Sequence, residues 1–280
     1  MMKKYGNVLK TAVVLAGMMV LFVSAAAAAE KPAEKKSTEK ATTEKAAAET
    51  KSGAAKTDAK ATSETKTAEK TAGKAVDTKD MVPLKVDLPK AMYVGTPKNI
   101  RSTNLEPPRK PGQMRVMPLV PPGTVNLALK KRVTSSDKEP IIGEVELITD
   151  GDKNAKDGCF VEFAPGQQWV QVDLGAKCDI YVILIWHYHS EGRVYRDVIV
   201  QTADDPDFVT GVKTVFNNDH DNTAKMGAGK EKEYIENNEG KLIECKDVQA
   251  RYVRLYSGGN TSNDMNHYTE VEVYGKPVGK

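Results

Sequence analysis

Residues 169–186 have the sequence WVQVDLGAKCDIYVILIW, which combines two different apolar patterns. In Trp169–Gly175 every second residue is apolar, as expected for a strand with one face in the core. Ile180–Trp186 is apolar throughout, which is typical of a central strand that is buried on both faces. The two stretches therefore predict the middle of a β-sheet that is packed into a larger core.

Shorter strand patterns lie on both sides of this stretch. The segments between them contain turn-forming residues, such as those of Asp204–Asp207, and no clear amphipathic helix. Many short strands with turns between them predict an all-β sandwich or barrel, here over residues 123–277. The additional strands are expected at Leu127–Val133, Asp197–Thr202, Gly211–Phe216, Arg251–Tyr256 and Tyr268–Tyr274.

The first 122 residues predict three segments without a core of their own. Residues 1–29 have a basic start, an apolar run and an alanine-rich end, which predicts a cleaved secretory signal peptide. An uncleaved membrane anchor is the alternative, since Thr11–Ala29 is just long enough to span a bilayer. Residues 30–80 are rich in Lys, Ala, Thr and Glu and predict a disordered linker. Residues 81–122 are dense in proline, which predicts an extended arm along the sandwich.

Charge and cysteine content narrow the class of protein. The formal net charge is only +3, which argues against nucleic acid or anionic lipid as a partner. Strong membrane insertion beyond the signal segment is not expected, because the loop Ser135–Gly143 is short and has no aromatic side chain. The signal predicts an exported protein in the periplasm, at the cell surface or outside the cell. The three cysteines, Cys159, Cys178 and Cys245, have no zinc-type spacing and are interpreted as small buried side chains. A Cys178–Cys245 disulfide remains open.

The order of motifs along the chain resembles a known family. The motifs are NLALKKRVTSS (126–136), LITDGDKNA (147–155), QWVQVDLG (168–175), DVIVQTADD (197–205), ARYVRLY (250–256) and YTEVEVYG (268–275). Their order resembles the coagulation factor 5/8 type C (discoidin) domain of the galactose-binding-like superfamily, which includes bacterial carbohydrate-binding modules. The resemblance covers Val125–Gly275. It implies a jelly-roll β-sandwich and a binding function without catalysis.

The resemblance also implies a structural Ca²⁺ site. In the family, a loop containing Asp-Gly meets a glutamate of the last strand. Here Asp150 and Asp152 of TDGD and Glu270 of YTEVEVYG match that pattern, with backbone carbonyls near Ala155 and Thr269. Ca²⁺ prefers carboxylate and carbonyl oxygens, and a glycine allows the sharp turn between the two aspartates. Without the resemblance, an ordinary Asp-Gly turn would be the expected interpretation.

The family's ligand site lies on loops at one end of the sandwich, which here correspond to Trp186–Arg193, Asn217–Asn222 and Gly258–His267. These loops are rich in planar hydrogen-bonding side chains, which suit the fixed directions of sugar hydroxyls. The ordinary alternative is that such residues only form turns. The candidate ligand-binding residues are His187, His189, Arg193, Asn260, Asn263, Asn266 and His267.

These features favour a secreted or envelope-associated protein that binds a carbohydrate or a cell-surface glycan. One alternative is a scaffold or adhesion protein that binds an envelope protein. Another is a metalloenzyme in which His187, His189, His220 and His267 bind a metal with Asp219 or Asp221. No nucleophile elbow, HExxH motif or P-loop accompanies these histidines, so a non-catalytic protein is expected.

Overall fold

The computed structural model describes residues 80–98, 100–110, 113 and 115–279. The predicted signal peptide and nearly all of the predicted linker therefore lie outside the described residues. Strands and loops dominate the described part, and η2 (Val145–Thr149) is a 3-10 helix of five residues. The predicted all-β architecture is confirmed. No described helix has the length and apolar character needed to cross a membrane.

The main sheet has seven strands and is organised around two long ones, β6 (Gln168–Trp186) and β9 (Lys241–Ser257). The strand order is β3-β11-β6-β9-β7-β8, with β4 paired to β6, and every pairing is antiparallel. The shorter members are β3 (Val125–Asn126), β4 (Arg132–Ser135), β7 (Ile199–Ala203), β8 (Lys213–Asn217) and β11 (Glu270–Pro277).

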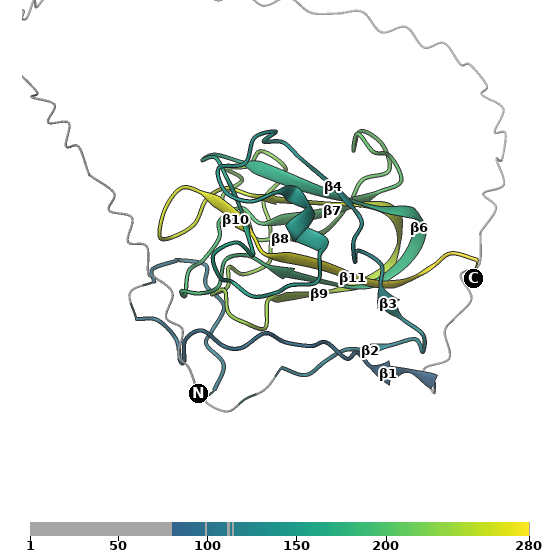
Figure 1. Ribbon diagram of the computed structural model, residues 1–280, viewed down its shortest axis with the longest axis horizontal. Helices are drawn as coiled ribbons and strands as arrows, with labels where there is room; N and C mark the ends of the chain where they lie inside the picture. Colours follow the sequence, from purple (N-terminus) through teal and green to yellow (C-terminus); the bar gives the residue numbers. More distant parts are fainter. Residues whose placement is uncertain (1–79, 99, 111–112, 114, 280) are drawn as a thin grey trace, which may run out of the picture. The chain divides into compact units, whose positions relative to one another are not determined.

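Strand β6 belongs to both layers of the sandwich. Its first half pairs with β4 and its second half with β11, and the register with β9 shifts between Asp173 and Cys178. Gly175 lies at this shift with a φ of 86°, a value that glycine adopts readily. Figure 1 shows β6 curving there from the layer of β4 and β7 to that of β11. The two strands predicted for this stretch are thus one bent strand.

The core explains the two apolar patterns of β6. In its second half, Ile183 and Ile185 face the core between the two layers, where Val170 and Val172 of the first half also pack. The alternate side chains of the second half face outward and belong to a second cluster. In this cluster Val182, Leu184 and Trp186 pack with Tyr274, Leu84 and Val120.

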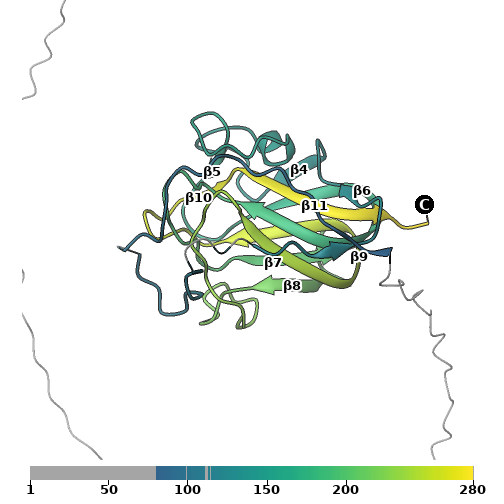
Figure 2. The same cartoon turned by 90° about the horizontal axis from the view of Figure 1, so that it is seen from below.

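The arm covers this second cluster. Strand β1 (Val82–Pro83) pairs with β2 (Leu119–Val120), and these two strands place Leu84 and Val120 on the outer face of the β6–β11 layer. Seen from below in Figure 2, the arm crosses the strands of this layer. Ile180–Trp186 is therefore buried on both sides, by the sandwich core on one side and by the arm on the other.

A small second sheet lies at the end of the sandwich away from the bend of β6 (Figure 1). It consists of β5 (Val161–Phe163) and β10 (Asn266–Tyr268), which pair antiparallel. The register places His267 directly opposite Glu162. Strand β5 was not predicted from the sequence, and this pairing positions the candidate ligand site.

The strand predicted over Leu127–Val133 forms only at Arg132 and Val133, which belong to β4. Residues 127–131 instead form a turn in which Lys130 has a φ of 55° and donates its N–H to the Thr149 carbonyl at 2.6 Å. All three cysteines are free thiols, and Cys178 and Cys245 are buried in the core. The disulfide left open by the sequence is absent from this structure.

Candidate ligand-binding site

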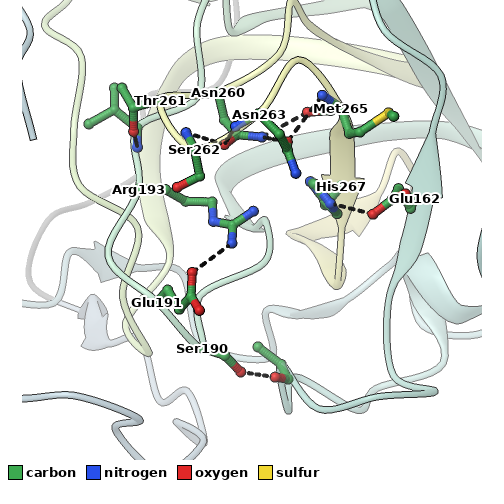
Figure 3. Close-up of polar contacts among 12 residues, drawn as sticks. Glu162, Ser190, Glu191, Arg193, Asn260, Thr261, Ser262, Asn263, Met265 and His267 are labelled. Carbon is green, nitrogen blue, oxygen red and sulfur yellow. Dashed lines mark hydrogen bonds and ion pairs between the residues drawn. The ribbon is translucent and has the colours of Figure 1, made fainter.

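A buried hydrogen-bond chain ends at the exposed side of the β5–β10 pair. His267 Nε2 lies 2.8 Å from Glu162 Oε2, and His267 Nδ1 lies 2.9 Å from the Tyr195 hydroxyl. Burial raises the pKa of Tyr195 well above its ordinary value, so its hydroxyl keeps its proton and donates to Nδ1. Nε2 then carries the imidazole proton and donates to Glu162, which fixes the orientation of that carboxylate (Figure 3).

His267 is neutral in this chain. Its distance from Glu162 would allow an ion pair, but burial outweighs that attraction and lowers the pKa of His267 from 6.5 to about 4. The ring therefore acts as a fixed donor to Glu162, and the site has the negative charge of Glu162 without a compensating imidazolium.

The shifted pKa of His267 predicts a pH dependence of stability. Between pH 6.5 and about 4 the unfolded chain binds a proton that the folded chain excludes, so the free energy of unfolding falls as the pH drops through this window. The loss is on the order of 2–3 kcal/mol. In His267→Gln the side chain binds no proton in this range, so the variant lacks this loss of stability. Urea unfolding at neutral and at acidic pH should show a smaller loss in the variant than in the wild type, whereas parallel losses would contradict the assignment.

Arg193 supplies the cationic group of the site. Only 6% of its surface is exposed, its Nη2 donates to Glu191 Oε2 at 3.1 Å, and its guanidinium carbon lies 4.6 Å from the centre of the Tyr188 ring. Arg193 Nε is buried and has no hydrogen-bond partner among the described residues. The guanidinium is thus held in place by stacking on Tyr188 and by its contact with Glu191.

Aromatic rings pack around these polar groups. Phe160 packs edge-on against Tyr188 with 4.9 Å between ring centres, and each ring lies 5.8 Å from His267. We call Phe160, Glu162, Tyr188, Arg193 and His267 the aromatic site. It combines an apolar wall with a guanidinium donor and a carboxylate acceptor, contributed by three separate segments of the chain.

Of the seven residues predicted from the sequence, three lie at or beside the aromatic site. Arg193 and His267 belong to it, and Asn263 is exposed on the neighbouring loop, as Figure 3 shows. Their contact with a ligand stays a prediction. The sequence analysis did not select Phe160, Glu162, Tyr188 or Glu191, although two of these lie in the loop that it had singled out.

The predicted asparagines Asn260 and Asn266 are buried and hold the loop in shape. Asn260 Nδ2 donates to Asn263 Oδ1 at 2.6 Å and to the Met265 carbonyl at 2.9 Å. Asn266 Nδ2 donates to the carbonyls of Ala164 and Gly166. Because these amides are satisfied within the protein, they support the shape of the loop, and their contact with a ligand stays a prediction.

His187 and His189 are also fully buried, and their contact with a ligand stays a prediction. His187 Nδ1 lies 2.5 Å from Glu236 Oε1, and its ring stacks on Tyr195 with 4.3 Å between centres. His189 Nε2 lies 2.9 Å from the Lys153 carbonyl. Both side chains lie beneath the surface and support the loops that carry the aromatic site.

The histidines do not assemble into a metal site. Among the described residues, the one group of potential ligands within 4.8 Å of one another is Asp197, Asp219 and Asp221, and it contains no histidine. His220 is exposed, whereas His187 and His189 each have a separate partner. The arrangement proposed for a histidine-based metalloenzyme is therefore not formed by these side chains.

The residues expected to bind Ca²⁺ lie around the Gly151 turn. Glu270 is fully buried; its Oε2 accepts the Gly151 N–H at 3.1 Å, and its Oε1 has no partner among the described residues. Asp150 is exposed on this turn, and its charge acts on Glu270. Asp152 instead accepts the Asn154 N–H at 3.0 Å and lies 3.4 Å from the Cys159 thiol. The structure thus joins Glu270 to the turn but leaves Asp152 directed elsewhere.

Two cavities of ≈310 Å³ and ≈260 Å³ lie away from the aromatic site, between the arm and residues 234–242. Their charged side chains are paired with one another. Arg109 Nη1 lies 2.5 Å from Glu239 Oε2, and Lys241 Nζ lies 3.0 Å from Glu106 Oε2. A ligand entering this cleft would have to displace these ion pairs.

A family model matches part of the sandwich. Residues 147–255 are similar to the NedA-like, galactose-binding domain of the F5/8 type C family. The match includes Glu162, Tyr188 and Arg193 but ends before His267, and it does not include the arm. A comparison with curated proteins finds no match.

Three solved structures are among those similar to this chain. A family 89 glycoside hydrolase from Clostridium perfringens is 20% identical over 56% of this chain and 15% of its own (TM-score 0.42). The CBM32 of AlyQ, in complex with 4,5-unsaturated mannuronic acid, is 21% identical over 51% of this chain and 92% of its own (TM-score 0.38). A Streptococcus pneumoniae fucose binding module is 19% identical over 55% of this chain and 98% of its own (TM-score 0.38). The chain spans 15% of the hydrolase's length.

Proposed function

We propose that this protein is a non-catalytic carbohydrate-binding protein whose ligand contacts the aromatic site. The observation that carries the proposal is the position of Arg193 and of the Glu162–His267 pair beside the Phe160–Tyr188 wall. A sugar ring has an apolar face that packs on aromatic side chains and hydroxyls that both donate and accept hydrogen bonds. The aromatic site offers a surface for the apolar face of the sugar ring. It also offers a donor and an acceptor for the hydroxyls.

The charges of the site favour a neutral glycan over an acidic one. Arg193 is paired with Glu191, and His267 is neutral, so Glu162 remains an uncompensated carboxylate. A second carboxylate on the ligand would be repelled by Glu162, while a hydroxyl would donate to it. The aromatic site is therefore expected to prefer neutral hexoses and their oligomers to uronic acids.

A structural Ca²⁺ ion is part of the proposal and rests on the unpaired oxygen of Glu270. The neighbouring buried carboxylate, Glu272, has partners in Lys153 at 2.8 Å and the Tyr274 hydroxyl at 2.9 Å. Glu270 Oε1 has none among the described residues, and burial raises the pKa of Glu270 to about 9. A cation held by Glu270 and Asp150 would supply the missing partner. The ion would join the Gly151 turn to β11.

Export is proposed from the sequence of residues 1–29 alone, and it would place the protein in the periplasm, at the cell surface or outside the cell. A second candidate function, the binding of an envelope protein, is favoured by exposed apolar side chains on the arm. Val94 is 99% exposed and Val116 is 91% exposed. Such a partner would contact the arm rather than the aromatic site.

Isothermal titration calorimetry of the purified protein against neutral and acidic glycans tests the proposed function. Tyr188→Ala should abolish the heat of binding to the glycan that the wild type binds, because it removes the ring that packs on both Phe160 and Arg193. Tyr181→Ala is the matched control, since that half-buried tyrosine packs near the arm-covered cluster. Equal losses in both variants, or binding of no glycan by the wild type, would contradict the proposal.

A further inference from the structure

The arm packs directly against the loop that carries Arg193. Gly192 lies between Glu191 and Arg193, and a Cβ at this position would overlap Cγ of Pro97 and come within 3.3 Å of Tyr93 Cζ. The φ of Gly192 lies outside the left-handed region, so backbone conformation does not require a glycine here. What requires it is the close approach of Pro97 and Tyr93.

Two hydrogen bonds also connect Tyr93 to Arg193, the residue that follows Gly192. The Tyr93 hydroxyl donates to the Glu236 carbonyl, and the Glu236 N–H donates to the Arg193 carbonyl at 2.9 Å. Burial raises the pKa of Tyr93 to about 12, so the hydroxyl remains a donor at neutral pH. Tyr93 is thus connected to the backbone of Arg193 through the single residue Glu236.

Glu236 also supports the other half of the aromatic site. Its carboxylate lies 2.5 Å from His187, whose ring stacks on Tyr195. Tyr195 in turn donates to His267, which orients Glu162. The guanidinium and the carboxylate of the aromatic site are therefore both supported by the residue that Tyr93 contacts.

We propose that Tyr93 and Pro97 of the arm are positioning residues of the ligand site. By packing on Gly192 and holding Glu236, they fix the distance between Arg193 and the Glu162–His267 pair. Neither residue touches the ligand in this arrangement. The inference rests on the proposed function for its effect on affinity, but the effect of the arm on Arg193 exists without any ligand.

A double-mutant cycle tests the contact between arm and loop. Gly192→Ala should weaken binding of the glycan by about tenfold, since the added methyl group displaces the loop and changes the direction of the guanidinium. Pro97→Ala removes the ring atoms that the methyl group would overlap, so the double variant should recover most of the affinity. Such coupling is expected only for residues in direct contact.

The control separates positioning from stability. Leu84→Ala also weakens the packing of the arm, but it acts at the cluster over Trp186 and Tyr274. It should lower the melting temperature while leaving the affinity, measured well below that temperature, unchanged. A Leu84→Ala variant that loses as much affinity as Gly192→Ala would overturn the inference, because the arm would then act through stability alone.

A second readout requires no glycan. The Arg193 Nε–H signal in a ¹H–¹⁵N spectrum should shift in Gly192→Ala and return toward its wild-type position in the double variant with Pro97→Ala. If the wild type binds no glycan but this signal behaves as expected, the proposed function fails while the positioning role holds. An unchanged Arg193 signal in Gly192→Ala would overturn the positioning role whether or not a glycan binds.

Discussion

Arg193→Ala should reduce the affinity for the glycan by at least about 100-fold, the largest effect of a single substitution at the site, given about 1.5–3 kcal/mol for a hydrogen bond to a charged group plus the loss of stacking. The guanidinium stacks on Tyr188 and donates to Glu191. Its removal also leaves Tyr188 without this stacking partner. Calorimetric titration of wild type and variant with the same glycan measures the effect.

Arg254→Ala is the matched control for this prediction. Arg254 is likewise held between aromatic rings, with its guanidinium carbon 4.4 Å from the Trp169 ring centre and 4.1 Å from that of Phe208. It makes no contact with the aromatic site. If Arg254→Ala weakened glycan binding as much as Arg193→Ala, the loss would reflect general destabilisation and the role of Arg193 would be contradicted.

The effect of Glu270→Gln on stability should change sign when Ca²⁺ is added. In EDTA at neutral pH the variant is expected to be more stable than the wild type by on the order of 2–3 kcal/mol. The sign follows from the raised pKa of Glu270, whose folded value of about 9 exceeds its ordinary 4.5. A carboxyl group whose pKa is raised by folding contributes its full stability below the unfolded pKa of 4.5, and this stability is lost as the pH rises toward the folded pKa of about 9. Glutamine has no proton to retain and avoids that loss.

With saturating Ca²⁺ the order should invert, because only the wild type offers a carboxylate to the ion. An ion at 1,000 times its Kd adds about 4.1 kcal/mol to the free energy of unfolding, which exceeds the deficit of the wild type in EDTA. Thermal unfolding of both proteins in EDTA and in Ca²⁺ measures this. Glu272→Gln is the control and should destabilise under both conditions, since it leaves Lys153 unpaired. A wild-type melting temperature that is indifferent to Ca²⁺ would contradict the proposed ion.

The sequence predicted the core of the fold because the apolar patterns of β6 are long and distinct. It indicated that Ile180–Trp186 is buried on two faces, and the structure shows that the arm covers the second face. It missed β5, since a strand of three residues has too few positions to show alternation. The one bent strand was predicted as two because Gly175 and its neighbours interrupt the apolar pattern.

The candidate site was less predictable than the fold. The loops were identified from their composition, but composition does not distinguish Asn260, which is buried, from Asn263, which is exposed three residues later in the same loop. Phe160 has the appearance of a core residue in the sequence. Glu162 becomes recognisable only once the β5–β10 register places it opposite His267. These properties depend on tertiary contacts between segments that are far apart in the chain.

The most direct test of carbohydrate binding at the aromatic site is a ¹H–¹⁵N NMR titration of the isotopically labelled protein with a neutral glycan. Saturable shifts are predicted for Phe160–Glu162, Tyr188–Arg193 and residues 262–267, with no comparable change for Arg109 and Glu239 in the cleft beneath the arm. Shifts centred on that cleft, or no shifts with any neutral glycan, would contradict the account.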